Sequence, residues 1–200
     1  MNSLKKSRIK SVLRYTWPFY ILTVIIVIPL MMFVFRATHR LPNYKVITLF
    51  VSGKMEGSKK LKNDLIEAYK DSELKEVSII SSDPDDVVLY QQKLTIAGYN
   101  TADILIVPRS KLDIVNVNAF GLSLSDELIN EYYSGCSFYS QDDVKFGVKI
   151  NREKTNEYFS LPSEDCFMIL NGKSVNTGKY SPKEIKEHDN ALQIVKDWGM

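Results

Sequence analysis

Hydrophobic positions fall into one long run near the start of the chain and several short runs after it. The long run, residues 17–35, contains no charged residue. At the helical rise of about 1.5 Å per residue it spans about 28 Å, close to the hydrocarbon thickness of a bilayer. It is apolar on every face, unlike a surface helix, which is apolar along one stripe. The run therefore predicts a membrane-spanning helix.

The next hundred residues alternate between β-prone runs and amphipathic stretches. A continuous apolar run is typical of a strand that is covered on both faces, and a stretch with one apolar side is typical of a helix. The order β-α-β-α-β favours parallel strands that are joined by right-handed helical crossovers. The predicted strands are 45–51, 77–80 and 104–107; the predicted helices are 57–70 and 83–98, the second with Asp83 as its N-cap and Gly98 as its end.

The second half of the chain is less regular. It predicts a helix at 125–134, strands at 144–150 and 166–170, and a last helix that starts at a capping box beginning with Ser181. The fold class we expect is α/β: an N-terminal transmembrane helix followed by one three-layer domain with a mostly parallel sheet. The expected segments are a basic end (1–16), the span (17–35), a stalk (36–44) and the domain (45–200).

The charge distribution predicts the orientation of the span. Five basic residues and no acidic residue precede it, and two basic residues, Arg36 and Arg40, follow it closely. Basic residues beside a span tend to stay in the cytoplasm, so we expect a cytoplasmic N-terminus and an extracytoplasmic domain in the cell membrane. Seven of the 26 basic residues lie before Leu41, which leaves 19 basic against 24 acidic residues in the domain. An acidic domain lacks the basic surface that nucleic-acid binding requires, whereas the basic N-terminal end can bind anionic lipid headgroups.

A cleaved signal peptide is the alternative for the apolar run. The run is long for that role, no A-x-A pattern follows it, and no cysteine follows it closely for lipidation. We therefore expect an uncleaved anchor. The two cysteines, Cys136 and Cys166, would then lie outside the cytoplasm, where a disulfide between them can persist. The alternative is that the two cysteines are small buried side chains that do not contact each other.

Motifs for catalysis or cofactor binding are absent from the sequence. It contains no G-x-S-x-G, Walker-type loop or H-E-x-x-H, and only two histidines, His39 and His188. Asp83, Asp85 and Asp86 lie close together, but the start of a helix explains them. We expect no enzymatic activity, no cofactor and no metal.

Three segments, KVITLFVSG, VSIISS and TADILIVPRSKL, follow one another with helical stretches between them. In this order they resemble the opening lobe of bacterial extracellular solute-binding proteins, which serve ABC transporters. The tail from CFMILNGKS to the last helix is also similar to that family. The resemblance covers roughly 45–198 and implies a non-catalytic binding lobe for a small polar solute, with a transporter permease as partner. A complete family member has two lobes, and the segment here has room for about one.

The expected ligand site follows from the strand pattern. In open parallel sheets ligands bind beyond the carboxyl ends of the strands. The loops at those ends carry hydroxyls and one guanidinium that suit a polar ligand, although ordinary capping and turn chemistry would place the same residue types there. The tentative ligand-binding residues are Ser52, Ser81, Ser82, Arg109 and Ser110.

Two other functions stay open. The first is a structural or assembly subunit of a membrane complex, in which the span itself contacts other helices. The second is an exterior hydrolase. Replacing the span by an unrelated apolar helix distinguishes the first of these from a binding lobe, because only an assembly subunit depends on the sequence of its helix.

Overall fold

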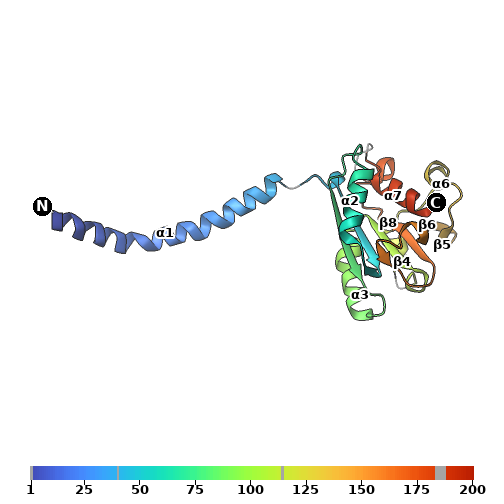
Figure 1. The fold of residues 1–200 in the computed structure, drawn as a ribbon, viewed down its shortest axis with the longest axis horizontal. Helices are drawn as coiled ribbons and strands as arrows, with labels where there is room; N and C mark the ends of the chain where they lie inside the picture. The colour runs from blue at the N-terminus through green and yellow to red at the C-terminus, as the bar shows by residue number, and fades with distance from the viewer. Residues whose placement is uncertain (1, 40, 114, 183–187) are drawn as a thin grey trace. The chain divides into compact units, whose positions relative to one another are not determined.

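The computed structural model describes residues 2–39, 41–113, 115–182 and 188–200, with side chains described from Thr16 to Phe35 and, within those ranges, from Leu41 onward. The chain divides into two compact units, Met1–Leu41 and Pro42–Met200. The first is a single helix, and all strands belong to the second (Figure 1).

Helix α1 (Asn2–His39) contains a segment, Thr16–Phe35, that is long and apolar enough to cross a membrane. Its side chains from residue 17 to 35 are all exposed. The helix extends beyond the apolar run at both ends and takes up the basic segment and part of the expected stalk. Lysine, arginine and leucine favour helices, so the local sequence supports this extension.

The second unit is built on a six-stranded mixed sheet with the order β3-β1-β4-β8-β6-β5. The three strands predicted in the first half are parallel neighbours, as expected. A separate two-stranded ribbon pairs β2 (Lys54–Met55) with β7 (Phe159–Ser160). The sheet strands are β3 (Glu76–Ser82), β1 (Val46–Ser52), β4 (Ile104–Pro108), β8 (Cys166–Leu170), β6 (Val144–Lys149) and β5 (Phe138–Gln141).

The other half of the sheet is antiparallel, which the expected mostly parallel arrangement did not include. β8 runs antiparallel to both β4 and β6, and β6 runs antiparallel to β5. Asp142 and Asp143 join β5 to β6 and have φ angles of 51° and 63°. Positive φ at both central residues is the geometry of a tight hairpin, which forces neighbouring strands to be antiparallel.

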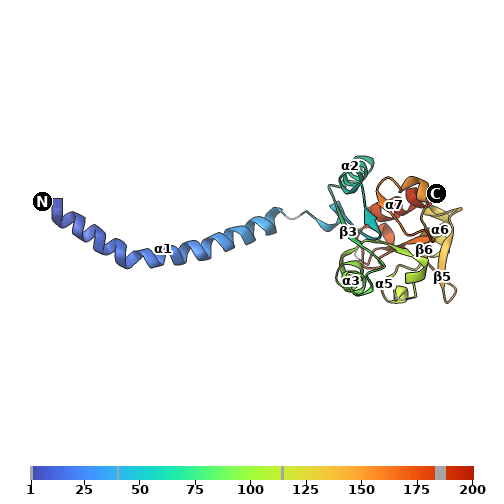
Figure 2. The same cartoon turned by 60° about the horizontal axis from the view of Figure 1, so that its bottom comes forward.

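Helices cover both faces of the sheet. Figure 2 shows α2 (Ser58–Ala68) and α7 (Asn190–Gly199) on one side, where α6 (Asp126–Tyr132) also packs. The other side carries α3 (Val87–Lys93) with its π-helical continuation Leu94–Gly98, α4 (Tyr99–Thr101) and α5 (Val117–Phe120). Short 3₁₀ turns occupy Asn43–Lys45, Arg109–Lys111, Arg152–Lys154 and Gly178–Tyr180.

Each face of the sheet has its own apolar core. Ile47 and Leu49 of β1 face the helices α2 and α7, and Trp198 of α7 closes this core at 6% exposure. Phe50 points to the opposite face and meets Tyr90 of α3. A continuous apolar run such as β1 contributes side chains to both cores, because successive side chains of a strand point to opposite faces of the sheet.

Two predicted helix boundaries are wrong. Asp86, rather than Asp83, caps α3 by accepting the Leu89 N–H, while Asp83 accepts the Asp85 N–H in the preceding turn. The helix also continues past Gly98 to Thr101. A run of acids offers several competing caps, so the sequence alone does not select one.

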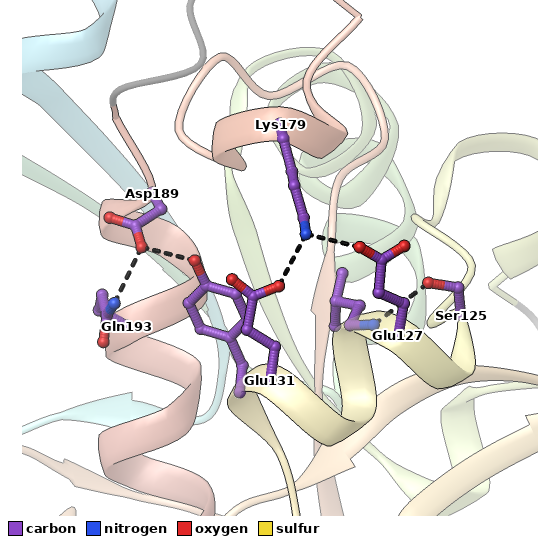
Figure 3. A network of polar contacts seen from close by, with 8 residues as sticks. Ser125, Glu127, Glu131, Lys179, Asp189 and Gln193 are labelled. Atoms are coloured by element: carbon purple, nitrogen blue, oxygen red, sulfur yellow. Dashed lines mark hydrogen bonds and ion pairs between the residues drawn. The ribbon is translucent and has the colours of Figure 1, made fainter.

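The last helix, α7, starts later than its expected capping box. It begins at Asn190, and the Lys183, Glu184 and Ile185 positions of the predicted start lie outside the described residues. Figure 3 shows the contacts beside it: Lys179 bridges Glu127 and Glu131 of α6 at 2.7 and 2.9 Å, and Asp189 accepts hydrogen bonds from Tyr132 and Gln193. These contacts join α6 to the segment before α7.

Candidate functional site

A cleft of 290 Å³ lies at the sheet edge where β1, β3 and β4 end. Its lining comes from the segments that follow these three strands and from the segment 160–164, which precedes β8. The carboxyl ends of parallel strands are the usual ligand edge of an open α/β sheet. The cleft is therefore the candidate site.

The segment 160–164 forms one wall and is held in place by backbone contacts. β2 pairs with β7, and a Cβ atom at Gly53 would lie only 2.6 Å from the Ser160 carbonyl oxygen, so the close approach requires glycine. The guanidinium of Arg152 donates hydrogen bonds to the carbonyls of Pro162 and Glu164. Arg152 thus positions the wall from outside the cleft.

Charges of both signs line the cleft. Lys54 lies 3.7 Å from Asp83, a distance that leaves the ion pair loose. Glu164 accepts hydrogen bonds from the Ser110 backbone N–H at 2.7 Å and from its hydroxyl at 2.6 Å. Lys111 and Asp85 complete the charged lining. Among the described residues, the side chains of Lys111 and Asp85 have no hydrogen-bond or ion-pair partner.

Of the five sequence-predicted ligand residues, Ser110 lines the cleft. Ser52 and Ser82 are buried beneath it, at 0% and 3% exposure, and Ser52 Oγ lies 2.9 Å from the Tyr90 hydroxyl. The Ser82 hydroxyl has no hydrogen-bond partner in the described part of the chain. Ser81 uses its backbone carbonyl to accept a hydrogen bond from Lys93 Nζ at 3.0 Å.

Buried hydroxyls beneath the cleft support the strand ends. Burial raises the pKa of Tyr90 to about 12, and its hydrogen bond with Ser52 opposes the rise only in part. Tyr90 is therefore a neutral phenol at physiological pH, and its bond to Ser52 fixes α3 to the end of β1. Ser52 is therefore a buried structural residue, and its hydroxyl is not accessible to a solute.

Arg109, the one guanidinium in the predicted set, turns away from the cleft lining. Its guanidinium carbon lies 4.8 Å from the Tyr139 ring centroid, and its backbone N–H donates to the Asp165 carbonyl at 2.8 Å. Stacking on an aromatic face is a common use of arginine. Arg109 thereby links the end of β4 to the β5 side of the sheet.

The residues that the sequence reasoning missed are Lys54, Asp85, Lys111 and Glu164. Lys54 and Lys111 lie within two residues of predicted positions and Asp85 lies within three, so their place in the strand-end loops was an available signal. Glu164 lacked such a signal because it precedes β8. Only the antiparallel pairing of β8 with β4 brings its start to the same edge.

A second cavity of 450 Å³ lies farther along the same edge, where β6 ends and β8 begins. Cys166 lines it at 1% exposure, and burial raises the pKa of this thiol to about 11 despite the opposing charge of Arg152. Burial also raises the pKa of Cys136. Both groups are therefore poor nucleophiles at neutral pH.

Both cysteines are free thiols. Ile150 separates them in the sheet, since its backbone N–H donates to the Cys166 carbonyl at 3.0 Å and the neighbouring Lys149 N–H donates to Ser137 at 2.8 Å. Two strand spacings amount to about 10 Å. Disulfides join Cα atoms that lie within about 7 Å, so the predicted pairing requires the strands to move. The geometry therefore favours two unpaired thiols, and labelling of the thiols tests the predicted pairing.

The opposite edge of the sheet holds a buried polar network centred on Asp103. Its carboxylate accepts hydrogen bonds from the Thr48 backbone N–H at 2.7 Å, from the Ser174 hydroxyl and from the Asn176 amide at 3.3 Å. Burial raises the pKa of Asp103, and these donors oppose the rise. Thr48 belongs to β1, Asp103 precedes β4, and Ser174 and Asn176 follow β8, so the network joins these three segments.

Metal and histidine chemistry find no support in the described residues. They contain no group of three or more His, Cys, Asp or Glu side chains that could hold a metal ion. The His188 ring stacks on Tyr44 with a centroid distance of 4.1 Å, far in sequence from the strand-end loops. No protein-family model, curated protein or solved structure matches the chain.

Proposed function

We propose that the chain is a single-pass membrane-anchored domain that binds a small polar solute in the strand-end cleft and performs no chemistry on it. Thr16–Phe35 anchors the chain, and the excess of basic residues before the span keeps the N-terminus in the cytoplasm. The domain then lies on the extracytoplasmic side of the cell membrane.

The observation that carries this proposal is the position and lining of the cleft. It lies at the carboxyl ends of β1, β3 and β4, it has a volume at the lower limit of small-molecule sites, and it presents several charged groups. Within the domain, β1 begins at Val46, at the opposite edge of the sheet from the cleft.

The resemblance to extracellular solute-binding proteins supports the same proposal. A mixed sheet with helices on both faces suits one lobe of such a protein, and in a two-lobed member the ligand lies against the strand-end edge. A single anchored lobe supplies one wall. Attachment to the membrane gives the lobe a high effective concentration toward a permease or another membrane partner.

Thermal unfolding of the full-length chain in mild detergent tests the proposal. Trp198 lies in the core at 6% exposure and reports unfolding of the domain, whereas Trp17 belongs to the apolar span. A panel of sugars, amino acids, amines and carboxylic acids should contain solutes that raise the melting temperature.

Matched lysine variants assign any such rise to the cleft. Lys111→Ala removes a lining charge and should reduce the rise, while Lys75→Ala, an exposed lysine before β3, should preserve it. A panel without a stabilising solute, or an equal rise in both variants, would reject the cleft as the binding site.

A further inference from the structure

The charges of the cleft are separated across three strand ends. Asp83 and Asp85 follow β3, Lys54 follows β1, and Lys111 follows β4, while the sheet order at this edge is β3-β1-β4. Neighbouring strands lie about 4.8 Å apart, so the ends of β3 and β4 are about 10 Å apart. Asp85 thus lies on one side of the cleft, and Lys111 lies on the other side, where the carboxylate of Glu164 is held by Ser110.

Internal contacts leave one charge of each sign available for a ligand. Ser110 donates two hydrogen bonds to Glu164, which occupies both of its carboxylate oxygens. Lys54 interacts with Asp83. The side chains of Asp85 and Lys111 have no partner within the described ranges, so each can engage a group of opposite charge on a solute.

From this arrangement we infer that the solute is a small zwitterion of the amino-acid class, with its ammonium group toward Asp85 and its carboxylate toward Lys111. The inference rests on the proposed function. An ammonium and a carboxylate on one carbon, each with a hydrogen bond to its partner, bridge the distance between the two sides. The cleft volume of 290 Å³ limits the solute to a small one.

Other solute classes fit the charges less well. A neutral sugar would displace water from the charged side chains and offer them no opposite charge in return. A dianion would meet a lining of two lysines and three carboxylates, whose net charge is already negative. A simple amine would pair with Asp85 and leave Lys111 beside the solute without a counter-charge.

Titration calorimetry on the full-length chain in detergent tests the inference. The probes are an L-amino acid mixture, then each stabilising amino acid with its decarboxylated amine and its deaminated acid, and a set of monosaccharides. Each lost charge pair should weaken binding by about ten- to a hundredfold, the usual contribution of a charge-assisted hydrogen bond.

Two neutral variants of similar shape localise the effect. Asp85→Asn should weaken binding of the amino acid and leave binding of its deaminated acid little changed. Lys111→Gln should also weaken binding of the amino acid, but it should leave binding of the decarboxylated amine little changed. Lys75→Gln serves as the control. Amino-acid binding that neither cleft variant changes would overturn the inference.

The outcome with sugars separates this inference from the proposed function. Monosaccharides that bind, with loss of binding in Lys111→Gln and no binding of amino acids, would overturn the zwitterion inference and support the proposed function. A chain that binds no probe in the whole set would reject both.

Discussion

Replacement of Asp103 by alanine is expected to destabilise the domain strongly. The change removes the acceptor for the Thr48 N–H, the Ser174 hydroxyl and the Asn176 amide, in a side chain that is 8% exposed. A buried donor without an acceptor costs about 1–3 kcal/mol. Three donors at the lower end of this range give a loss of about 3 kcal/mol in the free energy of unfolding.

The same site predicts a pH dependence. Burial raises the pKa of Asp103 in the folded state above its unfolded value, which is about 3.9. The folded state then binds the proton more tightly, so this carboxyl's contribution to stability falls as the pH rises through the interval between the two pKa values. Asp103→Asn lacks this titration. Wild type should therefore be more stable relative to Asp103→Asn at pH 4 than at pH 7.

Urea unfolding of the full-length chain in detergent, followed by Trp198 fluorescence, measures both effects. Asp71→Ala, at an exposed position, is the matched control and should change stability by less than about 0.5 kcal/mol. A loss below about 1 kcal/mol for Asp103→Ala, or a difference from Asp103→Asn that grows with pH, would refute the structural role assigned to this carboxylate.

Three further predictions concern the edge of the sheet and the surface. Arg152→Lys should lower stability by about 1–2 kcal/mol and weaken solute binding, because the lysine side chain is shorter and does not place its ammonium where Nη2 of Arg152 meets both carbonyls of the wall; calorimetry showing wild-type affinity would contradict this. Alkylation of the unreduced, denatured chain should add two groups, at Cys136 and Cys166, by mass spectrometry; no addition would show a disulfide. Lys179→Met should leave the melting temperature nearly unchanged, because exposed ion pairs such as that with Glu127 contribute little; a fall as large as that of Asp103→Ala would contradict it.

The sequence predicted the first half of the domain well. Strands β1, β3 and β4 and helix α2 lie where the apolar runs placed them, because strands covered on both faces read as continuous apolar segments. The candidate edge followed from their parallel order. The second half was harder to predict, since β5 and the two-residue strand β7 are too short to give a periodic pattern. The two-residue strand β2 escaped prediction in the first half for the same reason.

The residues of the cleft were only partly predictable. Ser110 was found through its place after β4, while Ser52 and Ser82 were chosen for the same reason but lie beneath the surface. The sequence does not show how far a loop projects past a strand end. Arg109 illustrates a second limit, because its partner Tyr139 belongs to a strand that local sequence did not predict.

Protease treatment of intact cells tests the central claim, an anchored domain outside the cytoplasm, most directly. Cleavage should remove the domain that begins at Pro42, while a short fragment that contains Thr16–Phe35 stays in the membrane. Complete protection in intact cells, with digestion only after lysis, would place the domain in the cytoplasm. A mature chain that begins after the apolar helix would contradict the anchor.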